Sequence, residues 1–377
     1  MKLPNKLQLK LTPRKESNSL RTLELSENGI DFYSNDYLGL ANSTELFNDV
    51  HAFISKNEHL KNGSTGSRLI SGNQSIHLEL ESYLATVHNS QSALLYNSGY
   101  DANIGFFSCV PQRNDVIFYD NLIHASIRDG IRLSNSKSYS FKHNDFESLI
   151  KKINNLEHIE EIYIVTESVF SMDGDMPNLK ELIDISKKYN CKLIIDEAHA
   201  LGVFGLGAIQ TQQLEDSIFA RIMTFGKGLG CHGAVVLCNS DLKSYLVNFS
   251  SAFIYTTALP AHSITTIKLA YNYLLKKTSI TEPLKQNISY FKETCITLGI
   301  DHLFTKSNSA IQSCILKDGA NVILIAKKMR DKGFNVKAIL PPTVPINEER
   351  IRFCIHNFNT KEDIYSLLSL LKQTLVK

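Results

Sequence analysis

Apolar residues in the middle of the chain form short runs that alternate with segments of helical spacing. Strand-sized apolar runs occupy residues 92–96, 115–120, 161–170, 191–196, 221–226 and 233–239. Between two of these runs, residues 179–190 place apolar side chains at helical spacing, which is typical of a strand–helix–strand unit. Several runs are apolar at consecutive positions, as in strands that helices cover on both faces. The pattern predicts an α/β domain with a largely parallel sheet.

After about residue 275 the pattern predicts a smaller α+β unit. Helices are expected at 276–299, 321–333 and 361–376, and strands at 310–316 and 349–355. We therefore expect three parts: an N-terminal arm over residues 1–38, a large α/β domain over 39–278 and a small C-terminal domain over 279–377.

Composition narrows the class of protein. The 377 residues are 43% hydrophobic and 21% charged, which favours a globular protein with two domains. A net charge of +2 gives no field that would attract nucleic acid or an anionic membrane. The seven cysteines contain no CxxC pair, and no apolar run approaches the roughly 20 residues of a membrane helix. We expect a cytoplasmic protein without a metal; a basic start, free of acids until Glu16, leaves a transit peptide as the alternative.

Polar residues follow the predicted strands where each strand ends. In an open α/β sheet, ligands bind beyond the carboxyl ends of the strands, so these residues should meet at one edge. They are the turn Asn97-Ser98-Gly99-Tyr100-Asp101, His124, the segment 168–175, Asp196, His199 and Lys227.

This set matches the needs of pyridoxal phosphate (PLP). The cofactor needs an amine for its aldehyde, an acid for its pyridine nitrogen and a helix N-terminus for its phosphate. Lys227 supplies the amine, Asp196 the acid, and residues 99–100 the backbone donors. His124 can stack on the ring, and His199 can reach the phenolic oxygen.

The sequence also contains parts of two motifs of nucleotide-binding proteins, but both are incomplete. Residues 196–199 spell DEAH, the box of a helicase, but an ATPase also needs a GxxxxGK[ST] loop. The only GK pair, at 226–227, is followed by glycine and lacks the upstream glycine. Residues 228–233 match GxGxxG, yet a strand follows where a dinucleotide site needs a helix. A dinucleotide oxidoreductase remains a weaker alternative.

Nine motifs in order resemble those of the α-oxoamine synthases, PLP enzymes of fold type I. They are SNDYLGL (34–40), GSTGSRLISG (63–72), HAS (124–126), TESVFSMDGD (166–175), DEAHALGVFG (196–205), TFGKGLG (224–230), IYTTALP (254–260), SAIQ (309–312) and PPTVP (341–345). The resemblance extends from about Arg14 to the C-terminus. It implies a mostly parallel sheet flanked by helices, a small α+β domain, and a homodimer with shared active sites.

The resemblance gives roles in cofactor binding to matching positions. It makes Lys227 the lysine that bonds to the cofactor and Asp196 the partner of the pyridine nitrogen. Further implied contacts are His124 over the ring, His199 and Ser171 at the phenolate oxygen, Thr224 at the phosphate, and Thr256 and Thr257 at the phosphate of the neighbouring subunit.

The resemblance also implies a reaction. Arg21, Asn35 and Arg352 match positions near the substrate, and the planar fork of Arg352 suits the carboxylate of an amino acid. The implied activity is the decarboxylative condensation of L-alanine with a pimeloyl thioester, carried on coenzyme A or on acyl carrier protein, as in biotin biosynthesis.

One position departs from that pattern. Members that use a pimeloyl group often read AIRPPTVP where this chain reads AILPPTVP, so Leu340 replaces an arginine. Leucine suits a masked or plain acyl chain better than a free carboxylate. A sister enzyme that uses glycine or serine with another acyl thioester therefore stays open, as does a PLP-fold protein that binds without turnover. Cys231 and His232 receive no role.

Some polar residues near these motifs have a structural explanation. Arg350 and Arg352 alternate along one predicted strand, so only one can face the site, and the resemblance favours Arg352. Glu197 should point away from Asp196, toward a salt bridge or solvent. His77 is expected to be structural.

Overall fold

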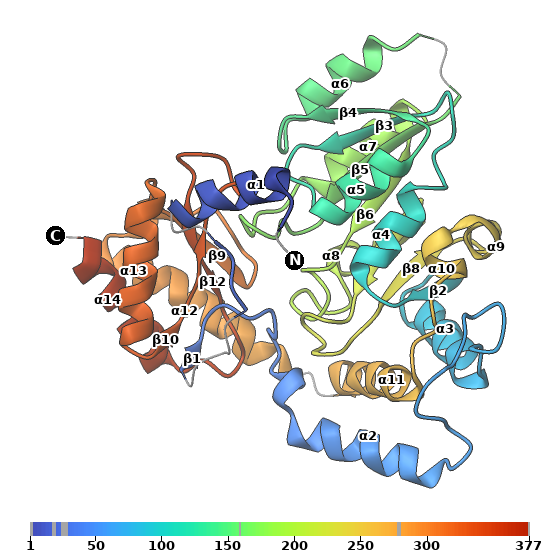
Figure 1. Ribbon diagram of the computed structural model, residues 1–377, viewed down its shortest axis with the longest axis horizontal. Coiled ribbons are helices and arrows are strands. Elements are labelled where there is room, and N and C mark those ends of the chain that lie inside the picture. The colour runs from blue at the N-terminus through green and yellow to red at the C-terminus, as the bar shows by residue number, and fades with distance from the viewer. Residues whose placement is uncertain (1–2, 17–19, 24–28, 158–159, 277–279, 376–377) are drawn as a thin grey trace.

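The computed structural model describes residues 3–16, 20–23, 29–157, 160–276 and 280–375. Two larger sheets, of seven and three strands, organise the described residues, and a third sheet has only two short strands (Figure 1). We call the seven-stranded sheet with its helices, residues 92–276, the large lobe. The three-stranded sheet with its helices, residues 280–375, is the small lobe.

Seven strands form the sheet of the large lobe, in the order β2-β8-β7-β6-β5-β3-β4. Strand β8 is antiparallel to both of its neighbours, and the other pairs are parallel. The strands are β2 (Ser92–Tyr96), β3 (Val116–Asp120), β4 (Lys137–Phe141), β5 (Ile162–Glu167), β6 (Lys192–Asp196), β7 (Ala220–Thr224) and β8 (Ala234–Cys238). The predicted mostly parallel sheet is confirmed.

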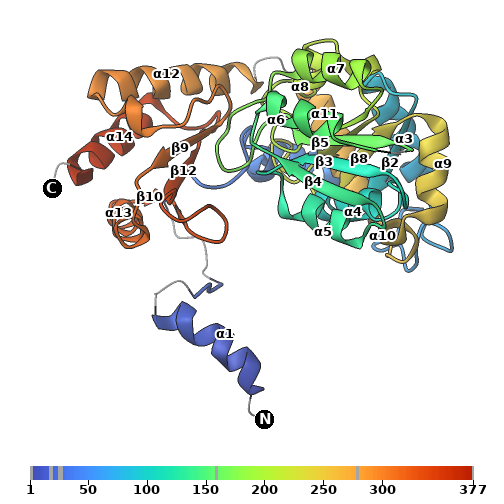
Figure 2. The same ribbon diagram turned by 90° about the horizontal axis from the view of Figure 1, so that it is seen from above.

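Helices cover both faces of this sheet (Figure 2). In β6, Ile194 packs in the cluster that includes α4 and α5, whereas Leu193 and Ile195 pack in the cluster that includes α6 and α7. This two-sided burial explains why the strands are apolar at consecutive positions. The helices up to the end of the large lobe are α1 (Asn5–Glu16), α2 (Thr44–Lys56), α3 (Ser75–Val87), α4 (Gly99–Phe107), α5 (Ala125–Leu133), α6 (Phe146–Asn154), α7 (Leu179–Lys188), α8 (Ala208–Thr211), α9 (Ser240–Phe249), α10 (Ser251–Ile254) and α11 (Ala261–Lys276).

The small lobe is an antiparallel sheet in the order β11-β12-β9, packed against three helices. Its elements are α12 (Glu282–Leu298), β9 (Ile311–Ile315), α13 (Gly319–Asp331), β10 (Phe334–Asn335), β11 (Ala338–Ile339), β12 (Arg350–Cys354) and α14 (Lys361–Leu375). Strand β1 (Ile30–Asp31) pairs with β10, which fixes the chain ahead of the SNDYLGL motif to this lobe. The three domain ranges stay a prediction, and residues 277–279 lie outside the described residues.

Helix α1 meets the rest of the chain near its C-terminal end, where Arg14 lines a cavity together with residues of the small lobe. None of its residues is buried, and in Figure 2 it projects away from both lobes. Among the described residues, no helix combines the length and the apolar character needed to cross a membrane.

Candidate active site

The carboxyl ends of the parallel strands bring several of the candidate site residues together. Glu167, the last residue of β5, is in register with Asp196, the last residue of β6. Lys227 follows β7 by three residues, and its Nζ lies 2.8 Å from Nε2 of His199. Burial lowers the pKa of the Lys227 amine, against the opposing charges of Asp196 and Glu167. The sheet therefore places an amine of reduced basicity beside a carboxylate, which suits a lysine that acts as a nucleophile or base.

A chain of hydrogen bonds leads from Lys227 toward the small lobe. Tyr37 Oη donates to Asn35 Oδ1 at 3.2 Å, so it accepts from Nδ1 of His199 at 2.7 Å. Nε2 of His199 is then free to accept from Lys227. Burial and the charge of Lys227 hold the pKa of His199 well below its usual value, in agreement with a neutral ring. Arg352 donates to the same Asn35 oxygen at 3.1 Å, which completes the chain.

The Asp196 carboxylate is fixed at both oxygens. Oδ1 accepts from the backbone N–H of Ala198 at 2.9 Å, and Oδ2 accepts from the amide of Asn103 at 2.9 Å. Asn103 lies on α4 and also donates to Ser126. The sequence reasoning missed Asn103, because a single asparagine inside an apolar helix carries no motif.

His124 lies at the start of α5, where its backbone N–H donates to Glu167 Oε1 at 2.6 Å. Its Nδ1 lies 2.7 Å from Ser126 Oγ, and the residue is exposed. Glu167 is 3% exposed, and burial followed by the charge of Asp196 raises the pKa of its carboxyl group. Glu167 also escaped the sequence reasoning, although its place at the end of a strand was a usable signal.

The N-terminus of α4 forms the opposite end of the site. Gly99 begins this helix after Ser98, whose side chain caps it. A Cβ on Gly99 would lie 3.2 Å from Cβ of Thr224, so the two residues are in direct proximity. Backbone N–H groups at a helix N-terminus, with a hydroxyl beside them, fit a phosphate. Tyr100 contributes only its backbone here, because its side chain donates to Asp129.

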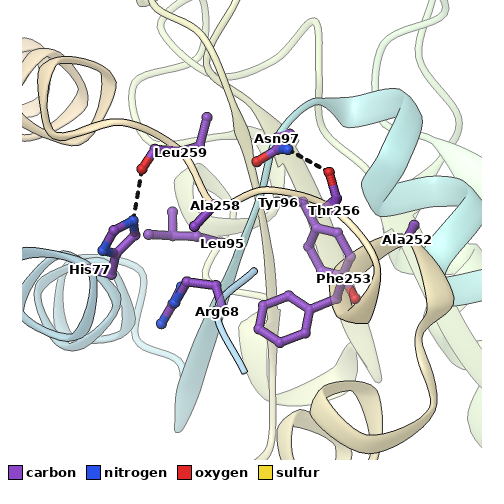
Figure 3. A pocket seen from close by; sticks show the side chains of 10 residues that line it. All are labelled: Arg68, His77, Leu95, Tyr96, Asn97, Ala252, Phe253, Thr256, Ala258 and Leu259. Atoms are coloured by element: carbon purple, nitrogen blue, oxygen red, sulfur yellow. Dashed lines mark hydrogen bonds between the residues drawn. The ribbon is translucent and has the colours of Figure 1, made fainter. Parts of the chain in front are cut away.

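Thr256 and Thr257 lie close to this end of the site in the same chain. The Asn97 side chain donates to Thr256 Oγ1 at 2.9 Å (Figure 3). It also donates to the carbonyl of Thr257 at 2.8 Å. Figure 3 also shows His77, whose ring contacts the carbonyl of Leu259 at 2.9 Å, in line with a structural role.

Two cavities lie next to the candidate site, and Arg21 and Thr343 line both of them. The first, about 440 Å³, lies between the segment ending in His124 and the segment beginning at Phe170, and Ser171 lines it. The second, about 610 Å³, is lined by Arg14, Arg21, Arg330 and Lys337 together with apolar residues that include Leu340.

The two arginines of β12 differ in their partners. Arg352 donates to the carbonyl of Ser171 at 2.9 Å and to Asn35, whereas Arg350 pairs with Asp173 and Glu348. Arg352 is therefore the one that joins the hydrogen-bond chain.

Two further polar residues have separate surroundings. Glu197 is fully buried and forms an ion pair with Arg221 at 2.8 Å. Of the two expected surroundings, a salt bridge or solvent, it therefore has the salt bridge. Within the described ranges, no group of His, Cys, Asp and Glu side chains has the arrangement of a metal site.

These residues fit PLP. The chain offers a buried amine, a carboxylate held by two donors, and an exposed imidazole on the segment next to them. It also offers a capped helix N-terminus where any larger residue at Gly99 would crowd Thr224. Each of the cofactor's aldehyde, pyridine nitrogen, ring face and phosphate thus has a matching protein group.

Comparison with known proteins agrees with the geometry. Residues 27–369 match the family described as aminotransferase class I and II. The chain is 38% identical to an 8-amino-7-oxononanoate synthase of Emericella nidulans, over 91% of this chain and 89% of the relative. It is 36% identical to the enzyme of the same name from Buchnera aphidicola, over 96% and 93%.

Solved structures share the fold. A serine palmitoyltransferase of S. paucimobilis with PLP and myriocin has a TM-score of 0.90 at 24% identity, over 99% of this chain and 98% of the other. An 8-amino-7-oxononanoate synthase of Francisella tularensis has a TM-score of 0.78 at 29% identity, over 93% and 99%.

The chain belongs to the aminotransferase class I and II family and has the fold of type I PLP enzymes. Within that class it is an α-oxoamine synthase, a PLP-dependent acyltransferase.

Proposed function

We propose that this chain condenses L-alanine with a pimeloyl thioester and releases carbon dioxide and a free thiol. The product would be 8-amino-7-oxononanoate, a step of biotin biosynthesis in the cytoplasm. The names of the relatives support this reaction. The observation that carries it is the hydrogen-bond chain from Lys227 to Arg352, which links a proton-transferring amine to a carboxylate-binding guanidinium.

The lysine and the aspartate have complementary tasks in this proposal. PLP, when bound, supplies an electron-poor ring that stores the charge left on the substrate. Lys227 holds the cofactor, and once released its amine takes the α-proton of the amino acid, a task that its lowered pKa favours. Asp196, fixed by Asn103 and the N–H of Ala198, keeps a proton on the pyridine nitrogen.

Further residues position the ring. His199, whose Nδ1 is held by Tyr37, would accept a hydrogen bond from the phenolic oxygen through Nε2, and Ser171 would contact the same oxygen. His124 covers the ring face, and the backbone at Gly99 with Thr224 holds the phosphate. Thr256 and Thr257 of a second copy of this chain would complete the phosphate site, which makes the proposed working unit a homodimer.

The substrates would enter from two directions. Arg352 and Asn35 bind the carboxylate of alanine, where the guanidinium fork can pair with both oxygens. The acyl thioester would occupy the two connected cavities, with Arg21 at their junction. The cationic lining of the larger cavity suits either the phosphates of a pantetheine carrier or the far carboxylate of the acyl chain.

The first test is the visible absorption of the PLP-loaded protein before and after L-alanine, glycine or L-serine. We expect L-alanine to change the visible spectrum at a lower concentration than glycine or L-serine does. In the Lys227→Ala variant, the absorption band that depends on the bond between lysine and cofactor should be absent. Incubation with alanine and pimeloyl-CoA, or pimeloyl carrier protein, should then release thiol and yield 8-amino-7-oxononanoate by mass spectrometry. A response to glycine or serine alone would contradict the substrate assignment.

A sister activity is the second candidate, because of Leu340. This residue lines the larger cavity beside Leu20, Leu23 and Ile339, so part of its wall is apolar. An acyl chain without a terminal charge would fit that wall. A panel of acetyl, palmitoyl and pimeloyl thioesters separates the two candidate functions, because the thioester with the lowest KM carries the acyl group that the cavity fits best. In the Leu340→Arg variant, the KM for the pimeloyl thioester should fall relative to that for the palmitoyl thioester.

A further inference from the structure

His143 is held at both ends of its ring, just outside the candidate active site. Its Nδ1 lies 3.0 and 3.1 Å from the two carboxylate oxygens of Asp120, and its Nε2 lies 2.8 Å from Oδ2 of Asp175. A neutral imidazole has only one N–H, so both contacts are hydrogen bonds only when the ring is the imidazolium ion. Two carboxylates on opposite sides therefore select the charged form.

The first carboxylate shapes the segment that leads to His124. Asp120 is the last residue of β3 and is completely buried. Its Oδ1 accepts from the backbone N–H of Leu122 at 2.8 Å, in the turn that ends at His124. The position of Asp120 thus affects where His124 and the start of α5 lie.

The second carboxylate belongs to the segment 170–175, which connects the two lobes. The carbonyl of Asp175 accepts from the N–H of Phe170 at 3.0 Å and closes this segment into a loop that contains Ser171. The small lobe binds the loop through its carbonyls: Arg352 donates to Ser171, Thr305 to Asp173 at 2.7 Å, and Ser307 and Ser309 to Gly174 at 2.8 and 2.9 Å.

Other contacts fix the ring of His143 between these segments. Its edge meets Phe170, with ring centroids 4.4 Å apart and planes at 90°. Asn144 donates from its backbone to Asp120 at 2.9 Å and from its side chain to Asp175 at 2.8 Å. The segment ending in His124 and the loop with Ser171 are the two sides of the 440 Å³ cavity.

We propose that His143 is a positioning residue: its imidazolium ties the His124 segment to the Ser171 loop and so sets the spacing of the two sides of the substrate cavity. This role rests on the proposed function, in which His124 and Ser171 contact the cofactor. His143 itself lines neither of the two cavities. The charge is maintained at neutral pH: burial opposes it, but the hydrogen bonds and charges of Asp120 and Asp175 raise the pKa of His143 to about 10.

The test uses the PLP-loaded full chain with His143→Gln, and His88→Gln as the matched control. His88 is buried and, like the partly exposed His143, is bonded at both ring nitrogens, to Gln210 and Tyr271, but it does not line the substrate cavity. We expect both variants to lower the melting temperature. Only His143→Gln should lower kcat/KM, by roughly tenfold or more, because small displacements of positioned groups are costly. It should also change the circular dichroism that the protein induces in bound PLP.

A double-mutant cycle separates positioning from general damage. If His143 acts through Asp175, the His143→Ala and Asp175→Ala losses in kcat/KM should not add, and the double variant should match the worse single variant. Asp175→Asn, which keeps an acceptor, provides a milder variant should the alanine changes prevent folding. Additive losses, or a His143→Gln protein that behaves as His88→Gln does, would refute the proposal.

The induced dichroism keeps this proposal separate from the proposed reaction. That signal needs no substrate, so it reports on His143 even if alanine proves to be the wrong amino acid. An unchanged dichroism in His143→Gln would overturn the positioning role while leaving the reaction intact. Absence of the expected product in the unmodified protein would affect only the reaction.

Discussion

At the scale of single residues, the site depends on the order of donors and acceptors along one chain of hydrogen bonds. Tyr37 has one proton and gives it to Asn35, so it must accept from His199. This arrangement leaves Nε2 of His199 without a proton and facing the Lys227 amine. The phenol oxygen of Tyr37 therefore fixes the tautomer of His199, the histidine next to Lys227.

Removing that oxygen tests the chain directly. Tyr37→Phe leaves Nδ1–H of His199 buried without an acceptor, which should lower the free energy of unfolding by about 1–3 kcal/mol. We also expect a roughly tenfold loss in kcat, because the imidazole no longer holds one orientation. Tyr83→Phe is the control: Tyr83 donates to Asn272 and lies outside the lining of both cavities. Equal kcat in the two variants would contradict this interpretation.

The sequence predicted which polar residues meet at the strand ends better than it predicted the residues that hydrogen-bond to them. Lys227, Asp196 and His199 follow strands, and strand ends in a parallel sheet meet at one edge. The supporting Asn103 lies on a helix, and Tyr37 lies far away in the sequence. Such contacts depend on how the helices and the N-terminal segment pack, which periodicity alone does not determine.

At the scale of elements, β2 and α4 form the strand–turn–helix unit in which we expect the phosphate site. Strand β2 ends at Tyr96 and α4 begins at Gly99, so the helix N-terminus lies beside the end of β7. The turn was predictable because glycine follows a buried strand and precedes a helical pattern. Edge strand β4 was not predicted, because its residues KSYSF alternate between polar and aromatic side chains and include no continuous apolar run.

The close approach at Gly99 leads to a prediction for cofactor affinity. Gly99→Ala places a methyl group 3.2 Å from Cβ of Thr224, which should shift the helix N-terminus away from the sheet. We expect PLP to bind roughly tenfold more weakly, equivalent to about 1.4 kcal/mol. The dissociation constant can be measured by fluorescence titration of the apoprotein.

Gly63→Ala is a matched control for that change. A Cβ on Gly63 meets nothing within 4 Å, so its PLP affinity should stay within about twofold of the unmodified protein. If Gly99→Ala also binds PLP with unchanged affinity, the backbone at the start of α4 does not hold the phosphate.

At the scale of the whole molecule, the two lobes meet through the loop 170–175, and His143 links that loop to the large-lobe sheet. The large lobe supplies Asp120, and the small lobe binds the loop through Arg352, Thr305, Ser307 and Ser309. The sequence placed this loop at the site through the motif TESVFSMDGD. It gave no sign that the loop also joins the lobes, because the loop makes these contacts through backbone carbonyls, apart from the ion pair between Asp173 and Arg350.

The same ion cluster should make stability depend on pH in a defined direction. The pKa of His143 rises from an ordinary 6.5 to about 10 in the folded chain, through Asp120 and Asp175 and against burial. A raised folded-state pKa stabilises the protein fully below the unfolded value, and that stabilisation is lost as pH rises through the folded value.

The melting temperature of the unmodified protein should therefore exceed that of His143→Gln by a constant margin below about pH 6.5. The margin should shrink steadily between about pH 6.5 and pH 10, because deprotonation leaves one carboxylate without its hydrogen bond. The two proteins should be compared by thermal denaturation at pH 6, 8 and 10. Taking the difference between their melting temperatures cancels the contributions of the other titrating groups. A margin that stays constant between pH 8 and pH 10 would mean that the ring is already neutral between its two carboxylates.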